Sequence, residues 1–152
     1  MKILVFSDSH GETKAMLAAA EAEKPDMLIH LGDNLRDGLA LGTQALCVRG
    51  NCDWGETHPE EETVELCGVK IFITHGHLYG VKSGLNRIAF KGREIGADLI
   101  LFGHTHRAYI AQNGDVRLFN PGAVSGRVWD REKTYGVVYL GGDEIRCEVK
   151  SV

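Results

Sequence analysis

Two histidines close together follow an apolar run in the second half of the chain. The segment Gly103-His104-Thr105-His106 comes directly after residues 98–102, which read as a buried strand. Two imidazoles at this spacing can chelate a metal ion, but oxygen ligands from elsewhere in the chain would be needed to complete the site. A pair of surface histidines on one strand face would give the same motif. The motif alone leaves both interpretations open, so the other strand ends must be considered.

Residue types that ligate metals also stand where the other predicted strands end. In open α/β sheets, side chains beyond the carboxyl ends of the strands converge even when they are distant in the sequence. A glycine, serine or threonine precedes each of these residues, and we expect the backbone to turn sharply there. The candidate ligands are Asp8, His10, Asp33, Asn51, His75, His104 and His106.

The donor set indicates more than one metal ion. Four imidazoles, two carboxylates and an amide oxygen are too many ligands for one ion, so two ions that share a bridging carboxylate fit the count. A mixed oxygen and imidazole set without thiolate favours Mn²⁺, Fe or Zn²⁺ over a closed structural zinc site. Two such ions about 3.5–4 Å apart suit an in-line attack on phosphorus.

Alternating strands and helices are predicted for the first third of the chain. Apolar runs at 3–6, 27–31 and 45–48 read as strands buried on both faces. The alanine-rich segment 12–24 and the short segment 35–41 read as helices. This order predicts a largely parallel α/β sheet.

The pattern changes in the remainder of the chain. A hairpin is predicted from 63–66 and 69–74, followed by a helix that Ser83 caps and that ends near Gly96. The last four apolar segments are short and joined by tight turns, which predicts a second, mainly antiparallel sheet. These segments are 108–112, 116–119, 136–140 and 144–149.

Composition and charge are ordinary for a globular protein. The 152 residues predict a single domain over 1–152, and the net charge of −4 gives no basic footprint for duplex nucleic acid. No apolar run approaches the roughly 18 residues of a membrane-spanning helix, and the apolar start of the chain is too short for a signal peptide. We expect a cytoplasmic protein with no membrane contact. The four cysteines lack paired spacing and read as reduced thiols.

As an ordered set, the motifs resemble those of the calcineurin-like metallophosphoesterase superfamily. The chain length is similar to that of its small bacterial and archaeal phosphodiesterases of the YfcE kind, and the turn Asn120-Pro121-Gly122 is similar as well. The matching motifs are Asp8-x-His10, Gly32-Asp33, Gly50-Asn51-x-Asp53, Thr74-His75-Gly76-His77 and Gly103-His104-Thr105-His106.

The resemblance implies a fold, a cofactor and a nucleophile. The fold would be an α/β, four-layer α/β/β/α sandwich of two mixed sheets packed face to face with helices outside. Two divalent ions would be bound, Mn²⁺ in the first place and Ni²⁺, Fe or Zn²⁺ as alternatives, and the hydroxide bridging them would attack phosphorus. Asp33 would bridge a first set of ligands, Asp8, His10, Asp33 and His106, and a second set, Asp33, Asn51, His75 and His104.

One position departs from the wider family. Many members have a histidine after the asparagine, where it protonates the leaving oxygen or contacts the phosphate, and this chain has Cys52. A neutral thiol with a pKa of about 8.5 is a weaker proton donor than an imidazolium. We place Cys52 with Asp33, Asn51 and Asp53 among the catalytic residues, although Cys52 could equally fill space beside the metals. The role of Asp53 is open, because its usual histidine partner is absent.

Other polar residues are assigned supporting roles. His77 is predicted to orient a ligand, and His30, inside an apolar strand, is predicted to be a hydrogen-bonded core histidine. Arg107 and Arg127 could contact a phosphate, but either is more often surface charge.

The favoured function is a metal-dependent phosphodiesterase acting on a small phosphoester. A phosphomonoesterase or a nuclease would use the same chemistry, although the negative charge counts against long nucleic acid. The fold also serves as a protein-binding scaffold in the retromer complex, and degraded ligands would favour that function. Here all seven positions carry competent ligands. The sequence leaves open whether identical chains form a homo-oligomer.

Overall fold

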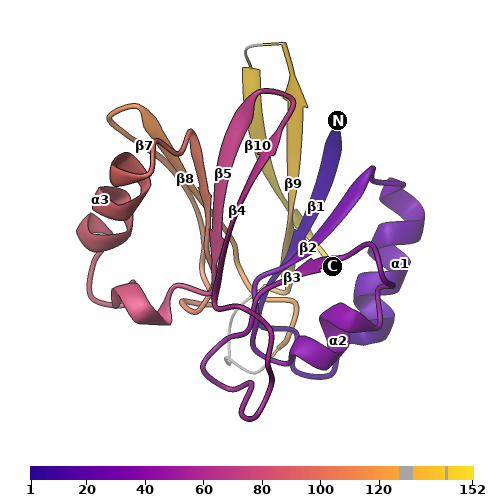
Figure 1. Cartoon of the computed structure of the whole chain (residues 1–152). Helices are drawn as coiled ribbons and strands as arrows, with labels where there is room; N and C mark the ends of the chain where they lie inside the picture. Colours follow the sequence, from indigo (N-terminus) through magenta and orange to yellow (C-terminus); the bar gives the residue numbers. More distant parts are fainter. Residues whose placement is uncertain (127–131, 143) are drawn as a thin grey trace.

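Two sheets pack face to face in the computed structural model, with helices on both outer sides (Figure 1). The structure describes residues 1–126, 132–142 and 144–152. In chain order the elements are β1 (Lys2–Phe6), α1 (Thr13–Glu23), β2 (Met27–His30), α2 (Leu35–Leu39), β3 (Leu46–Cys47), β4 (Glu61–Leu66), β5 (Val69–Thr74), the 3₁₀ helix η1 (His77–Tyr79), α3 (Asn86–Glu94), β6 (Leu99–Leu101), β7 (Ala108–Asn113), β8 (Val116–Pro121), β9 (Thr134–Gly141) and β10 (Glu144–Ser151).

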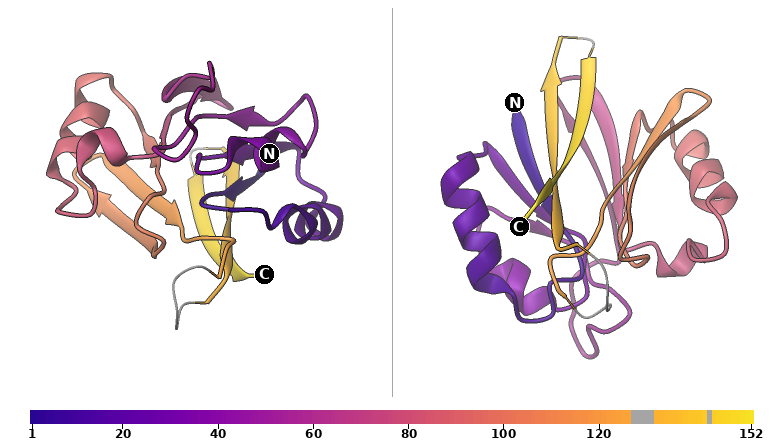
Figure 2. Two further views of the ribbon diagram at one scale, coloured as in Figure 1. Left: turned by 90° about the horizontal axis from the view of Figure 1, so that it is seen from below. Right: turned by 180° about the vertical axis from the view of Figure 1, so that it is seen from behind.

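Both sheets are mixed. In the first, of order β10-β9-β1-β2-β3, β1 pairs in parallel with β2 and antiparallel with β9. In the second, of order β4-β5-β6-β8-β7, β6 pairs in parallel with both β5 and β8, and β4 and β7 close the edges antiparallel. Figure 2 shows α1 and α2 covering the first sheet and α3 covering the second. The predicted four-layer sandwich is therefore confirmed.

The expectation of a separate, mainly antiparallel sheet from the last four strands is wrong. The β7–β8 hairpin joins the second sheet, whereas the β9–β10 hairpin returns to the first and pairs with β1. Tight turns predict each hairpin correctly, but the sheet that a hairpin joins is set by long-range pairing, such as that of Val138 with Ile3.

Alternation along β1 lets the second sheet pack on one face of this strand and α1 on the other. Ile3 and Val5 point into the apolar cluster between the sheets, and Leu4 and Phe6 point into the cluster under α1. All four side chains are fully buried. Residues 3–6 of β1 are all apolar, so they can all be buried only because other layers cover both faces of the strand.

The helix after the hairpin begins later than predicted. α3 starts at Asn86 with Leu85 at its N-cap, and no side chain caps it, so the prediction of Ser83 as the N-cap is wrong. The Ser83 N–H donates to the Gly80 carbonyl in a turn, and Gly84 follows with a φ of 153°. Because these residues are not helical, the helix can begin only after them.

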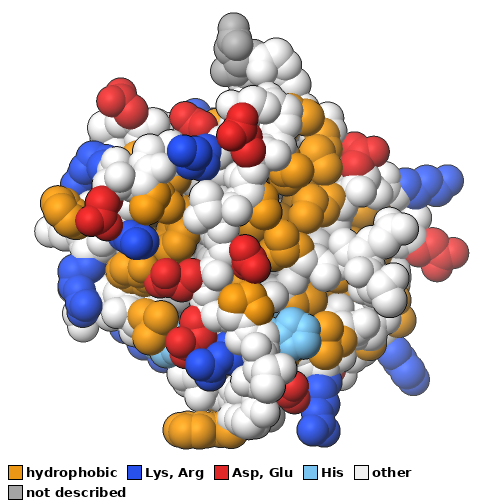
Figure 3. All heavy atoms as spheres, in the orientation of Figure 1, with side chains coloured by type: hydrophobic (Ala, Val, Ile, Leu, Met, Phe, Trp, Pro, Cys, Tyr) orange, Lys and Arg blue, Asp and Glu red, His pale blue; other side chains and the backbone are white. Residues whose placement is uncertain are grey.

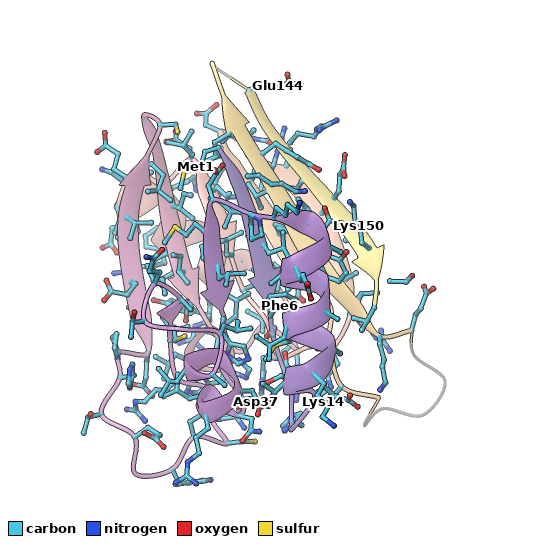
Figure 4. The ribbon with its side chains drawn as sticks, turned by 90° about the vertical axis from the view of Figure 1, so that its right-hand side faces the viewer. Met1, Phe6, Lys14, Asp37, Glu144 and Lys150 are labelled. Carbon is cyan, nitrogen blue, oxygen red and sulfur yellow. The ribbon has the colours of Figure 1, made fainter. Side chains whose placement is uncertain are left out.

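The ends of β1, β2, β5 and β6 meet at one end of the molecule, the lower end in Figure 1. Figure 4 shows that Lys14, near the start of α1, and Asp37, on α2, lie at this same end. Met1 and Glu144 lie at the opposite end. The loops that follow these strands carry the candidate ligands.

Surface features agree with the composition. On the face drawn in Figure 3, acidic and basic side chains are interspersed and form no basic stripe. All four cysteines are free thiols, as predicted. Within the described residues, no helix is both long enough and apolar enough to cross a membrane.

Candidate metal centre

Six of the seven predicted ligands gather at the meeting point of the two sheets. One group consists of Asp8, His10, Asp33 and His106, and a second consists of Asp33, His75 and His104. Within each group the potential ligand atoms lie within 4.8 Å of one another. Asp33 belongs to both groups. The loops after β1 and β2 of the first sheet and after β5 and β6 of the second sheet supply these residues.

Asp8 has an oxygen that is suited to a cation. Its side chain is fully buried, and its Oδ2 accepts hydrogen bonds from Ser7 Oγ at 2.6 Å and from the His104 N–H at 3.1 Å. Its Oδ1 lies 3.0 Å from His106 Nε2 but accepts no hydrogen bond from the described residues. A buried carboxylate oxygen without a hydrogen bond is costly unless a positive charge compensates it, so this atom fits a metal ligand.

His75 has one nitrogen held by the backbone and the other facing the centre. Its Nδ1 lies 2.8 Å from the Leu31 carbonyl, which can only accept, so Nδ1 carries the proton. Nε2 faces the centre, 3.2 Å from His104 Nδ1 and 3.4 Å from Asp33 Oδ1. A carbonyl that fixes the tautomer in this way is the usual companion of a histidine that ligates a metal.

Electrostatics keep the carboxylates of this centre charged. Burial opposes ionisation, but the neighbouring His106 and His75 lower the pKa of Asp8, and His75 lowers that of Asp33. Burial also opposes protonation of His75, yet the two carboxylates raise its pKa. Burial together with the charges of His75 and Lys82 lowers the pKa of His104 to about 4. Ionised carboxylates beside His104, an imidazole that is kept neutral, are donors that suit a divalent cation.

Sharp backbone turns were expected at the glycine, serine or threonine before each ligand, but most of the predicted ligands adopt a turn conformation themselves. Left-handed backbone conformations, which cost side-chain-bearing residues free energy, occur at Asp8, His10, Asp33, His104 and His106. Such strain persists only where the surrounding structure enforces it, and five of the seven predicted ligands carry it.

Glycines at the centre are needed mainly for space. A Cβ at Gly103 would lie 1.9 Å from Ser7 Oγ, and one at Gly50 would lie 2.2 Å from Asp33 Oδ1. A Cβ at Gly32 would lie 2.4 Å from the Gly50 nitrogen. These contacts are shorter than side-chain atoms tolerate, so only glycine lets the ligand loops approach this closely.

Asp53 joins two of the ligand loops through the backbone. Its Oδ2 accepts from the N–H groups of Asp33 at 2.9 Å and Gly50 at 2.7 Å. Its Oδ1 accepts from those of Asn34 at 2.8 Å and Leu35 at 2.7 Å, at the start of α2. Four backbone donors use the accepting capacity of this carboxylate. These are the contacts of a residue that positions Asp33, whereas the predicted catalytic role of Asp53 stays a prediction.

A second carboxylate, Asp37 on α2, has a similar role that sequence reasoning missed. It accepts from the Gly11 N–H at 2.6 Å and from Ser9 Oγ and Thr13 Oγ1 at 2.9 Å, and thereby holds the loop that carries His10. It also accepts from Asn34 Nδ2 at 2.7 Å. Apart from its place one turn after the Gly32-Asp33 motif, nothing in the sequence marks it.

His30 is a hydrogen-bonded core histidine, as predicted. Its Nδ1 accepts from the Gly32 N–H at 3.2 Å, so Nε2 carries the proton and donates to Ser9 Oγ at 2.9 Å. Ser9 in turn donates to Asp37. Burial lowers the pKa of His30 to about 4, which keeps the ring neutral. Its two hydrogen bonds link the loops after β1 and β2.

Asn51 and Cys52 lie on the loop after β3 and are exposed. Asn51 Nδ2 donates to Cys52 Sγ at 3.4 Å, and the Cys52 N–H donates to Asp33 Oδ1 at 2.9 Å. Desolvation and the charges of Asp33, Asp53 and Asp8 raise the pKa of the Cys52 thiol to about 11. A backbone contact thus brings Cys52 against Asp33, whereas the ligand role of Asn51 stays a prediction.

His77 and Arg107 lie at the border of the centre. The His77 ring is 5.5 Å from the His75 ring, and its Nε2 is 3.5 Å from a Glu60 carboxylate oxygen. Arg107 borders a cavity that His104 and His106 also line. The predicted role of His77 in orienting a ligand stays a prediction, and Arg127 lies outside the described residues.

Comparison with known proteins identifies relatives along nearly the whole chain. The family described as "Calcineurin-like phosphoesterase superfamily domain" matches residues 1–143. YsnB of Bacillus subtilis (strain 168), named a probable metallophosphoesterase, is 34% identical over 147 residues, which cover 94% of this chain and 86% of YsnB. The phosphodiesterase YfcE of Escherichia coli (strain K12) is 28% identical over 170 residues, which cover 91% of this chain and 87% of YfcE.

A solved structure has the same fold. The crystal structure of a Streptococcus pneumoniae TIGR4 protein, described as a predicted phosphoesterase, superposes with a TM-score of 0.87 at 30% identity. The superposition covers 99% of this chain and 88% of that one. The two mixed sheets and their outer helices are therefore shared with a relative of similar length.

Replacing Asp53 with asparagine tests the positioning role. Asp53→Asn turns one accepting oxygen into a donor that faces backbone N–H groups, so we expect the free energy of unfolding of the metal-free protein to fall by about 1–3 kcal/mol. Urea denaturation measures this change, and Asp115→Asn, at an exposed aspartate, is the matched control. Unchanged stability together with abolished turnover would indicate a direct catalytic role for Asp53.

Proposed function

The chain belongs to the calcineurin-like phosphoesterase superfamily, and from this premise we propose that it is a phosphodiesterase with a two-metal centre. The family and its metal-dependent phosphoesterase chemistry agree with the motifs in the sequence. The number of ions, their identity, the preference for diesters and a cytoplasmic location are parts of the proposal.

The sharing of Asp33 between the two ligand groups carries the two-metal proposal. Each group has carboxylate and imidazole donors that approach one another closely around a common residue. We assign Asp8, His10, Asp33 and His106 to the first ion. We assign Asp33, His75, His104 and the side-chain oxygen of Asn51 to the second ion. Mn²⁺ suits this mixed donor set, and Ni²⁺, Fe or Zn²⁺ are alternatives.

The residues of the chain perform the positioning on which the chemistry depends. When bound, two divalent ions supply an activated water and stabilise the charge that develops on the phosphoryl oxygens. The Leu31 carbonyl keeps the His75 proton on Nδ1, and the Cys52 N–H fixes one oxygen of Asp33. Asp53 and Asp37 hold the surrounding loops. His104 and His106 line an open cavity, so we place the substrate on their side of the centre.

A preference for diesters with acidic leaving groups follows from the residue at position 52. A thiol whose pKa is raised to about 11 holds its proton firmly and gives little assistance to a departing oxyanion. A good leaving group needs no such assistance. The name of the relative YfcE, a phosphodiesterase, supports the same assignment.

The alternatives differ in what they require of the site. A phosphomonoesterase would use the same metal ligands on a dianionic ester, and a nuclease would need more positive surface than the net charge of −4 indicates. A non-catalytic scaffold would have no need for buried carboxylates with a left-handed backbone. Six described ligand positions converge, which favours an enzyme over a scaffold.

Metal addition to the stripped protein tests the centre. We expect bis-p-nitrophenyl phosphate turnover only after Mn²⁺, Ni²⁺, Zn²⁺ or another divalent ion is supplied, with Mn²⁺ the most effective. Asp33→Asn should reduce turnover by at least about 100-fold, because one residue serves both ions. The control Asp115→Asn should retain the wild-type rate. If none of the added ions restores turnover, the enzyme assignment is contradicted. An active Asp33→Asn variant would contradict the assignment of Asp33 as a ligand of both ions.

A series of leaving groups tests the role of Cys52. The wild-type rate should fall steeply from p-nitrophenyl to alkyl leaving groups, and Cys52→His should recover about 10-fold or more on the alkyl esters by supplying a proton donor. Cys67→His, at another exposed cysteine, is the control. Equal wild-type rates on good and poor leaving groups would show that position 52 does not limit the reaction.

A further inference from the structure

A cavity of about 640 Å³ opens beside the candidate metal centre. His104 and His106 form the end nearest the centre, and the other walls come from the segment 81–85 after η1 and from the loop after β6. Its size falls in the range of small-molecule sites, about 300–1,000 Å³. The phosphoryl group of a substrate needs only the end beside the histidines. The rest of the cavity is therefore available to an organic substituent.

The body of the cavity is apolar. Val81 and Phe102 are nearly fully buried, and Leu85 and Tyr109 also line the cavity. Tyr109, on β7, is 43% exposed, so its ring presents an accessible face. An accessible aromatic ring near aliphatic side chains favours a flat apolar group in the ligand, which it can stack against or meet with its edge.

Two cations border the same cavity. Lys82 and Arg107 are both exposed, and neither forms an ion pair with the described residues. No acidic side chain from the described part of the chain lines the cavity. Two uncompensated cations at one apolar cavity favour a ligand with a negative charge beyond the phosphoryl group at the metals.

We infer that this cavity binds a nucleotide-like substituent of the phosphodiester, a flat ring that carries a second anionic group. The inference rests on the proposed function and specifies its substrate class. The ring lies against Leu85 and Tyr109, and the second anionic group lies between Lys82 and Arg107. The cavity thus discriminates between phosphoesters that are identical at phosphorus.

Binding of three phosphate esters to the Mn²⁺-loaded protein tests this inference by isothermal titration calorimetry. Methyl phosphate, thymidine 5′-phosphate and thymidine 3′,5′-bisphosphate share one phosphoryl group and differ in the ring and the second phosphate. We expect the dissociation constant to fall about tenfold from the first ester to the second, and about fivefold more for the third at low salt. Equal dissociation constants for the first two esters would overturn the inference.

Variants separate the contributions of the ring and the second anionic group. Tyr109→Ala should reduce the advantage of thymidine 5′-phosphate over methyl phosphate to less than about threefold. Arg107→Gln should remove the added advantage of the bisphosphate and leave the effect of the ring. Phe90→Ala and Lys91→Gln, on α3 outside this cavity, are the matched controls and should change neither ratio. Tyr109→Ala and Arg107→Gln with wild-type ratios would also overturn the inference.

The outcomes distinguish this inference from the proposed function. Turnover in the metal panel without discrimination among the three esters would leave the phosphodiesterase and remove the nucleotide-like ligand. Discrimination that depends on Tyr109, without turnover of any ester, would leave the cavity as a ligand site and remove the phosphodiesterase.

Discussion

The fold depends on burying two carboxylates, Asp8 and Asp33, where two sheets meet. Charged groups in a protein interior are tolerated only when other charges and hydrogen bonds compensate them. The chain meets this constraint with histidines from three strand ends and with backbone N–H groups from the neighbouring loops. Backbone strain at five of the predicted ligands indicates that the arrangement is enforced by packing around it. A cation at this position would complete the charge balance.

Support for the centre is layered around it. Asp53 fixes the backbone of Asp33 and Gly50, and Asp37 fixes the loop that holds His10. Asn120 holds the histidine loop by donating to the Gly103 carbonyl at 2.9 Å and to Thr105 Oγ1 at 3.1 Å. The loops after β1, β2, β3 and β6 are therefore each tied to a buried polar side chain, and these side chains come from different elements. Such support keeps the ligands in place before any ion arrives.

Most strands and the candidate ligands at their ends could be predicted because the signals are local, whereas the four-layer arrangement was predicted from the family resemblance. Apolar runs mark buried strands, and ligand types at their ends mark the centre. The placement of β9 beside β1 could not be predicted, because it depends on pairing residues such as Ile3 and Val138. The role of Asp53 could not be predicted either, since its partners are backbone N–H groups, which every residue except proline has. Left-handed His104 and His106 follow from packing and not from residue type.

The most direct test of this account is the anomalous scattering of crystals grown with Mn²⁺ and measured at the manganese edge. We predict two peaks in the anomalous difference map, with the Asp33 carboxylate contacting both ions, His106 contacting one and His104 the other. A single peak, or two peaks of which only one contacts Asp33, would contradict it.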